Sequence, residues 1–239
     1  MCVHYSDELK HAFVVSPADL KKIVELLEKR IGKVNISVDC VDKIERKFNT
    51  VKDLVAYENS KSKRISRLHL RFLADDHSKS ATIVFRDPFW PLEAVSIDII
   101  GREDVVSRLK ENVLDVLSGM RPWYNWIARV NLLITFTIVL IFLFIILTIF
   151  IFFEWIPVSD SAPSNSGIVK GNAISILIPL STLLCLLGLH RFRGFLFPKI
   201  VFAIGQGESR FKLLEKIRWG VVISFGVSFA AGLLLIIFK

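Results

Sequence analysis

The hydrophobic and polar positions divide the chain into two parts with different patterns. Up to Arg129, charged residues are frequent, and apolar residues recur with the periods of amphipathic helices and strands. From Val130 to Phe153, 24 consecutive residues carry no charge. This break predicts an amino-terminal domain of residues 1–120, followed by a membrane region of residues 121–239.

The amino-terminal part alternates between helical and strand patterns. Helical spacing, with N-cap signals at Ser16 and Thr50, predicts helices over about 17–31, 51–57 and 103–118. Alternation of apolar and polar residues predicts strands over 34–41, 65–73, 81–86 and 95–100. The order predicts a small α+β domain, with one sheet of about four strands and two to three helices.

Three apolar stretches in the second part predict membrane-spanning helices. They cover about 130–153, 172–189 and 218–238. The first corresponds to about 36 Å of helix, which exceeds a hydrocarbon core of about 30 Å. Pro198 and Lys199 interrupt the apolar run 195–204, so residues 190–217 are predicted to be cytosolic or interfacial. A re-entrant segment is the alternative interpretation of that run.

The formal charge of +8 is unevenly distributed along the chain. Residues 1–128 carry 21 Lys and Arg against 19 Asp and Glu, whereas residues 129–239 carry 10 against 4. The surplus therefore flanks the apolar stretches, which is typical of cytoplasmic loops and not of a nucleic-acid-binding domain. This pattern predicts an integral membrane protein with a cytoplasmic amino-terminal domain and a non-cytoplasmic carboxyl terminus. Basic and aromatic residues beside the first span are predicted to anchor it at the membrane interface: Arg121, Trp123, Tyr124, Trp126, Arg129 and Trp155.

Small residues recur every four positions in the last apolar stretch. They are Gly220, Ser224, Ser228 and Gly232. Such a stripe lets two helices approach closely, so it predicts helix packing and favours a homo-oligomer.

Basic residues gather around the strand predicted over 65–73. The six positions are Lys61, Lys63, Arg64, Arg67, His69 and Arg71. One interpretation is a solvated sheet face whose charges pair with nearby carboxylates. The other is an anion site for a nucleotide, a short oligonucleotide or lipid headgroups. Only Phe48 and Tyr57 lie near enough in the sequence to suggest base stacking.

Catalytic and metal-binding patterns are not found in the sequence. The three cysteines, Cys2, Cys40 and Cys185, are odd in number and widely spaced, which indicates neither disulfides nor a zinc site. There is no Gly-rich phosphate loop, HExxH or GxSxG. Asp75-Asp76-His77 is typical of a turn between two strands. The sequence therefore predicts no enzyme activity, cofactor or metal.

The layout of a small domain followed by a few uncharged helices resembles the membrane-effector subunits of bacterial antiphage defence systems. That resemblance implies a homo-oligomeric membrane effector or ion-conducting channel in the bacterial inner membrane, with a role in antiviral defence. It also implies gating through the amino-terminal domain by an anionic, nucleotide-like ligand or a partner. The alternative is a non-conducting, membrane-anchored adaptor that recruits a partner protein through the same domain.

Overall fold

The computed structural model describes residues 2–76, 78–87, 93–129, 188, 191 and 193–237. The chain forms two compact units, one of Met1–Arg129 with Leu196–Lys239 and one of Val130–Phe195. Almost all of the second unit lies outside the described residues, so the fold is described for the first. We call this first unit the split domain, because two separate parts of the sequence build it.

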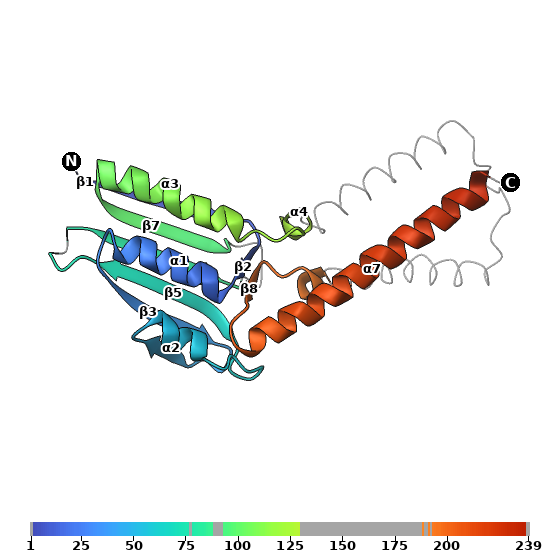
Figure 1. Ribbon diagram of the computed structural model, residues 1–239, viewed down its shortest axis with the longest axis horizontal. Helices are drawn as coiled ribbons and strands as arrows, with labels where there is room; N and C mark the ends of the chain where they lie inside the picture. Colours follow the sequence, from blue (N-terminus) through green and yellow to red (C-terminus); the bar gives the residue numbers. More distant parts are fainter. Residues whose placement is uncertain are drawn as a thin grey trace, which may run out of the picture. The chain divides into compact units, whose positions relative to one another are not determined.

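The split domain is built on a six-stranded antiparallel sheet (Figure 1). In spatial order its strands are β1 (Cys2–Leu9), β7 (Val95–Arg102), β6 (Ser80–Arg86), β5 (Ile65–Leu73), β3 (Lys33–Cys40) and β4 (Glu45–Phe48). The four predicted strands are confirmed as β3, β5, β6 and β7. The prediction of about four strands is wrong, because β1 and β4 extend the sheet at its two edges. Neither edge strand has a fully buried residue. Asp7 interrupts the apolar alternation of Val3, Tyr5 and Leu9 in β1, and β4 has only one apolar residue, Phe48, so neither sequence shows a complete alternation.

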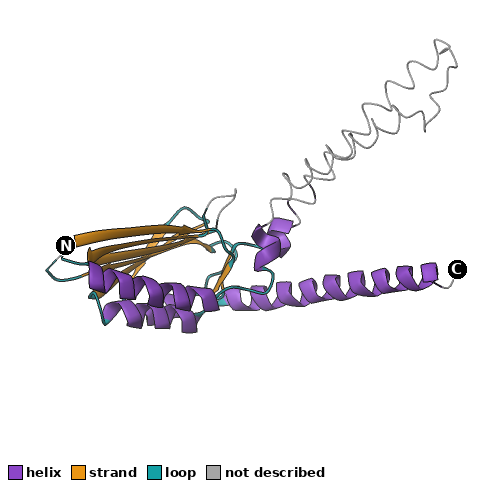
Figure 2. Cartoon of the chain, turned by 90° about the horizontal axis from the view of Figure 1, so that it is seen from above, coloured by secondary structure: helices purple, strands orange, loops and turns teal. Residues whose placement is uncertain are grey.

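The helices lie along one face of this sheet (Figures 1 and 2). They are α1 (Pro17–Glu28), α2 (Val51–Ala56) and α3 (Glu103–Gly119). The Oγ atom of Ser16 accepts a hydrogen bond from the backbone N–H of Asp19, and Thr50 forms a capping box with Asp53. These caps satisfy first-turn N–H groups that have no partner within the helix, which explains why both helices begin where the sequence predicts.

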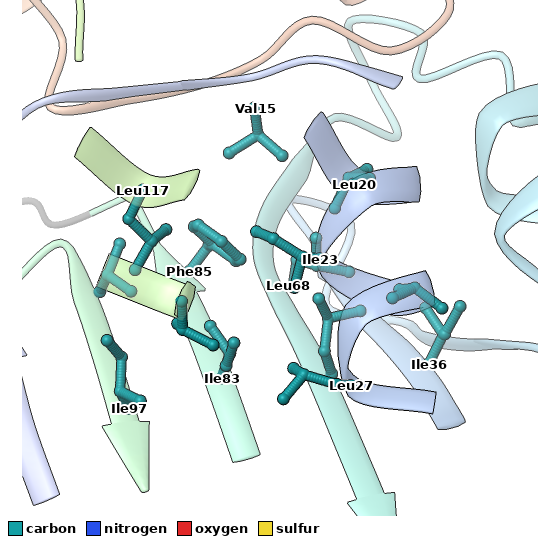
Figure 3. Packing of buried hydrophobic residues seen from close by; sticks show 14 of the residues in the cluster. Val15, Leu20, Ile23, Leu27, Ile36, Leu68, Ile83, Phe85, Ile97 and Leu117 are labelled. Carbon is teal, nitrogen blue, oxygen red and sulfur yellow. The ribbon is translucent and has the colours of Figure 1, made fainter. Parts of the chain in front are cut away.

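The core fills the space between the helices and the sheet (Figure 3). Figure 3 shows side chains of α1 and α3 opposite the inward-facing side chains of the central strands. The labelled residues are Val15, Leu20, Ile23, Leu27, Ile36, Leu68, Ile83, Phe85, Ile97 and Leu117, all buried. In Figure 2 no helix lies over the opposite face. We call that opposite side of the sheet the open face.

A strand from the carboxyl-terminal part completes the core. β8 (Ile200–Phe202) pairs in parallel with β2 (Phe13–Val15) as a separate two-stranded sheet. The N–H of Phe13 donates to the carbonyl of Lys199 at 2.7 Å, and Ile200, Phe202 and Ile204 are buried in the core. The structure thus forms a core strand within the run for which the sequence predicts an interfacial or re-entrant segment.

The side chain of Asn59 fastens this carboxyl-terminal segment to the start of β5. Asn59 is 1% exposed, and its Nδ2 donates to the carbonyls of Phe202 and Ile204 at 3.2 and 3.1 Å. Its Oδ1 accepts a hydrogen bond from the N–H of Ile65 at 3.0 Å. The backbone φ of Asn59 is 49°, a left-handed conformation that asparagine adopts more readily than most residues. One side chain therefore joins segments more than 140 positions apart.

Two glycines allow the chain to turn out of β8 into the long helix α7 (Gln206–Ile237). Gly205 has a φ of 51°, and a Cβ there would lie 2.5 Å from the carbonyl oxygens of Tyr57 and Glu58. A Cβ at Gly207 would overlap the carbonyl oxygen of Phe202. Only glycine fits such close backbone contacts.

The prediction of a three-helix transmembrane region is wrong for the described residues. Within them, no helix is both long enough and apolar enough to cross a membrane. α7 begins with a charged segment from Glu208 to Arg218, and its side chains are described only as far as Gly232.

The same finding overturns the predicted inner-membrane location with its cytoplasmic and non-cytoplasmic ends, and the descriptions of the chain as a membrane effector and channel. The predicted spans 130–153 and 172–189 lie outside the described residues. The third predicted span, 218–238, falls on α7.

Candidate functional site

The centre of the open face carries a row of basic side chains on β5. Leu68, Leu70 and Phe72 point into the core, so the alternating positions Arg67 and His69 lie on the open face and are partly exposed. Arg71 continues the row and is exposed. Neighbours in such a row are about 6.7 Å apart, since each residue advances a strand by about 3.3 Å. The structure therefore brings three of the six predicted patch residues onto one surface.

Arg86 of β6 lies directly opposite Arg67 in the antiparallel register. Like charges in this position repel each other, and directly opposed side chains are about 5 Å apart at Cβ. The Nε atoms of both residues are buried and have no hydrogen-bond partner in the described part of the chain. An unpaired buried donor costs about 1–3 kcal/mol. An anion bound between the two guanidinium groups would offset this repulsion.

Nearby carboxylates offset only part of this positive charge. Asp39 of β3 lies opposite Arg67 on its other side, 3.4 Å from Arg67 Nη1 and 3.6 Å from His69 Nε2. Arg71 has the neutral residues Asn35 and Thr82 as its cross-strand neighbours. The interpretation of charges paired with carboxylates therefore holds for Arg67 and His69, which share one aspartate.

The other three predicted patch residues lie in the turn before β5. Lys61, Lys63 and Arg64 are all exposed there. Arg64 Nη2 lies 3.6 Å from Oδ2 of Asp87, the residue that follows Arg86. Burial raises the pKa of Asp87, and the nearby Arg64 opposes that shift. The ion pair places Arg64 at the end of the sheet where Arg67 and Arg86 meet.

Replacement of Asp87 by asparagine is expected to stabilise the protein at neutral pH. A raised folded-state pKa means that folding favours the protonated carboxyl, so its stabilising contribution is lost as pH rises through that pKa. Thermal unfolding from pH 3 to pH 8 measures the effect. The gain of Asp87→Asn should be largest near pH 7 and vanish at low pH, while Asp75→Asn, in an exposed turn, should match the original protein throughout. A variant less stable at pH 7 would show that the pair with Arg64 outweighs burial.

The two candidate stacking residues lie away from the open face. Phe48 and Tyr57 both pack against the core, with their rings in edge contact at 5.7 Å. The Tyr57 hydroxyl donates to the carbonyl of Lys63 at 2.8 Å, and burial raises the pKa of Tyr57 to about 12. On the open face of β3, β5, β6 and β7, the described positions include no Phe, Tyr or Trp. This surface can bind phosphate oxygens but offers no platform for stacked bases.

The predicted interface anchors occupy a different region of the split domain. Tyr124 is buried, whereas Trp123 and Trp126 are exposed, as are Arg121 and Arg129. Trp126 and Arg129 belong to the short helix α4 (Asn125–Arg129), and Trp155 lies outside the described residues.

The guanidinium of Arg218, on α7, is fully buried 4.2 Å above the Tyr124 ring and 5.5 Å above that of Phe211. Its Nε donates to the carbonyl of Leu196. Burial lowers the pKa of Arg218. A cavity of about 230 Å³ lies beside Tyr124 and Phe211.

The predicted packing stripe on α7 is exposed along its whole length. Gly220, Ser224, Ser228 and Gly232 all lie on the surface, and a Cβ added at Gly220 or Gly232 would meet no atom within 4 Å. Oligomerisation through this stripe stays a prediction.

Between β5 and β6, the described polar residues form a turn. Asp76 accepts hydrogen bonds from the backbone N–H and the hydroxyl of Ser78, which is the turn that the sequence predicts. No group of three or more His, Cys, Asp or Glu side chains in the described ranges could hold a metal ion. The site therefore consists of the arginines and histidine of the open face.

Sequence reasoning did not identify Arg86 as part of this site. Ala81, Ile83 and Phe85 face the core, so the alternation of residues 81–86 places Arg86 on the other face of the strand. This alternation is the sequence signal that could have identified Arg86. That signal does not show which residue of the neighbouring strand it meets, because the register depends on the whole sheet. Comparisons of the chain with protein-family models, curated proteins and solved structures find no match.

Proposed function

We propose that the split domain binds a small phosphate-bearing ligand, such as a nucleotide, on its open face. The observation that carries this proposal is the direct opposition of Arg67 and Arg86, each with a buried Nε that lacks a partner in the described structure. Arg71 and His69 extend the positive row along β5. The ligand's phosphate oxygens would bridge β5 and β6, whose backbones are about 4.8 Å apart.

Guanidinium chemistry suits this role. A planar guanidinium offers paired N–H donors that match two oxygens of one phosphate, and such charge-assisted hydrogen bonds are about twice as strong as neutral ones. An anion held by both Arg67 and Arg86 replaces their mutual repulsion with two attractions. The lack of aromatic side chains on this face favours recognition of the phosphates over recognition of bases.

Recognition of an anionic ligand is assigned to the amino-terminal part of the chain, whose strands β5 and β6 carry the arginines. Recruitment of a partner protein through the same face is the competing outcome, because an acidic protein surface could also meet these arginines. A small free phosphate compound distinguishes the two.

Titration calorimetry of the full chain with ATP and with inorganic tripolyphosphate tests the proposal. We expect both compounds to bind, with affinity that falls as salt rises, because the contacts are ionic. Arg86→Ala and Arg67→Ala should each weaken binding about tenfold or more, since a charge-assisted hydrogen bond contributes about 1.5–3 kcal/mol.

The matched control is Arg108→Ala, which removes an exposed arginine from α3 on the helical side of the domain. Its affinity should equal that of the original protein. If Arg86→Ala and Arg108→Ala bind equally well, or if neither phosphate compound binds at all, the proposed site is wrong. An acidic partner protein that binds while both compounds fail would favour the adaptor alternative.

A further inference from the structure

In the described part of the chain, the outer edge of β1 is long and has no neighbouring strand. β1 is the last strand on its side of the sheet. Its eight residues pair with β7 without interruption, from Cys2 opposite Arg102 to Leu9 opposite Val95. It contains no proline, no lysine and no bulge, which are three of the features that prevent an edge strand from pairing with another chain. It does carry the charged residues Asp7 and Glu8, so pairing requires suitable residues opposite them.

The opposite edge of the same sheet shows such protection. β4 has only four residues, three of which are the charged Glu45, Arg46 and Lys47. It follows a tight turn in which Lys43 has a φ of 64°. A short, charged edge resists pairing with another strand. The two edges of the sheet therefore differ in how readily they can pair with a strand of another chain.

From this difference we infer that β1 pairs antiparallel with β1 of a second copy of this chain across a two-fold axis. A two-fold axis perpendicular to the sheet keeps the helices of both copies on one side and the open faces on the other. Residues that pair across the axis must then point to the same side of the sheet. The axis therefore passes through a residue of β1 and not between two residues. The contact is the same surface on both copies, so it closes as a dimer.

The charges along β1 select the register. With the axis at Ser6, His4 faces Glu8 of the other copy, Tyr5 faces Asp7, and Val3 faces Leu9. These pairs combine a base with an acid, a hydroxyl with a carboxylate, and two apolar side chains.

Neighbouring registers are less favourable. An axis at Asp7 would place two aspartates opposite each other, and an axis at Tyr5 would place Val3 opposite Asp7. An axis at His4 would oppose two histidines. The sequence of β1 is therefore complementary to itself in one long register.

Disulfide trapping at the axis tests this inference with the full chain. In a Cys2→Ser background, Ser6→Cys places two cysteines directly opposite each other, at a Cα separation of about 4.5–5.5 Å that accommodates a disulfide. We expect a crosslinked dimer on a non-reducing gel after mild oxidation at micromolar protein concentration.

The matched control is Ser96→Cys, one strand further in on the same face. Ser96 lies opposite Glu8, two residues from the axis, so its two thiols would be about 20 Å apart, too far to bridge. Cys2→Ser alone accounts for disulfides formed by Cys40 or Cys185.

Sedimentation velocity supplies an independent measurement without crosslinking. The original chain is expected to sediment as a dimer of 27.2 kDa protomers. Ser6→Lys opposes two lysines at the axis and should shift the chain to monomer, with an unchanged circular dichroism spectrum because Ser6 is exposed. A monomer at every concentration overturns the inference. So does an oligomer that Ser6→Lys leaves intact and Ser6→Cys fails to crosslink, because the contact then lies elsewhere.

Discussion

A fragment of residues 1–129 is expected to be largely unfolded at room temperature. It lacks β8, and with it the buried side chains of Ile200, Phe202 and Ile204. Each such side chain contributes about 1.5–3 kcal/mol through burial, so the fragment loses roughly 5 kcal/mol or more. Whole domains are stable by only about 5–15 kcal/mol. Circular dichroism and urea unfolding of the purified fragment measure this effect.

The control restores the missing strand without the second unit. Residues 1–129 are joined to 196–217 through a short Gly-Ser linker. A short linker suffices because the rings of Tyr124 and Phe197, near the two ends to be joined, are 5.6 Å apart. This fusion should unfold cooperatively, with a much higher urea midpoint than the fragment. A fragment of 1–129 that unfolds as cooperatively as the fusion would show that β8 is not needed for stability.

Replacement of Asn59 by leucine is expected to cost about 3–5 kcal/mol. The two side chains are similar in size, but leucine leaves the N–H of Ile65 and the carbonyls of Phe202 and Ile204 without their partner. Each unsatisfied buried group costs about 1–3 kcal/mol. The left-handed φ of 49° adds strain for leucine. Guanidinium unfolding followed by tryptophan fluorescence gives the free energy of unfolding.

Asn35→Leu is the matched control, because Asn35 is exposed on the open face. We expect its free energy of unfolding to stay within about 0.5 kcal/mol of the original value. If Asn59→Leu proves equally mild, the junction between β5 and the carboxyl-terminal segment does not depend on this side chain.

Local sequence patterns predicted many of the helices and strands of the split domain. The cap at Ser16 and the capping box at Thr50 depend on neighbours within three residues, so the starts of α1 and α2 were predictable. Strict alternation on β5 likewise placed Arg67 and His69 on one face before the partner strands were known. These predictions needed only the period of each element.

The remaining elements depend on pairing between segments that are distant in the sequence. β2 and β8 have three residues each, too few for a recognisable period, and they pair across more than 180 positions of sequence. An apolar run of this kind has the same composition whether it lies in lipid or in a protein core. Hydropathy therefore suggested an interfacial segment where burial against β2 forms a strand.

By itself, the sequence determined the type of most elements and the face of the sheet on which the β5 arginines lie, because helix and strand periods follow from local backbone geometry. Only the tertiary structure decided that Arg86 meets Arg67, that Asn59 joins two distant segments, and that β8 belongs to the core. Each of these depends on which segments pair and in which register. That choice minimises the free energy of the whole sheet and core, and no single segment encodes it.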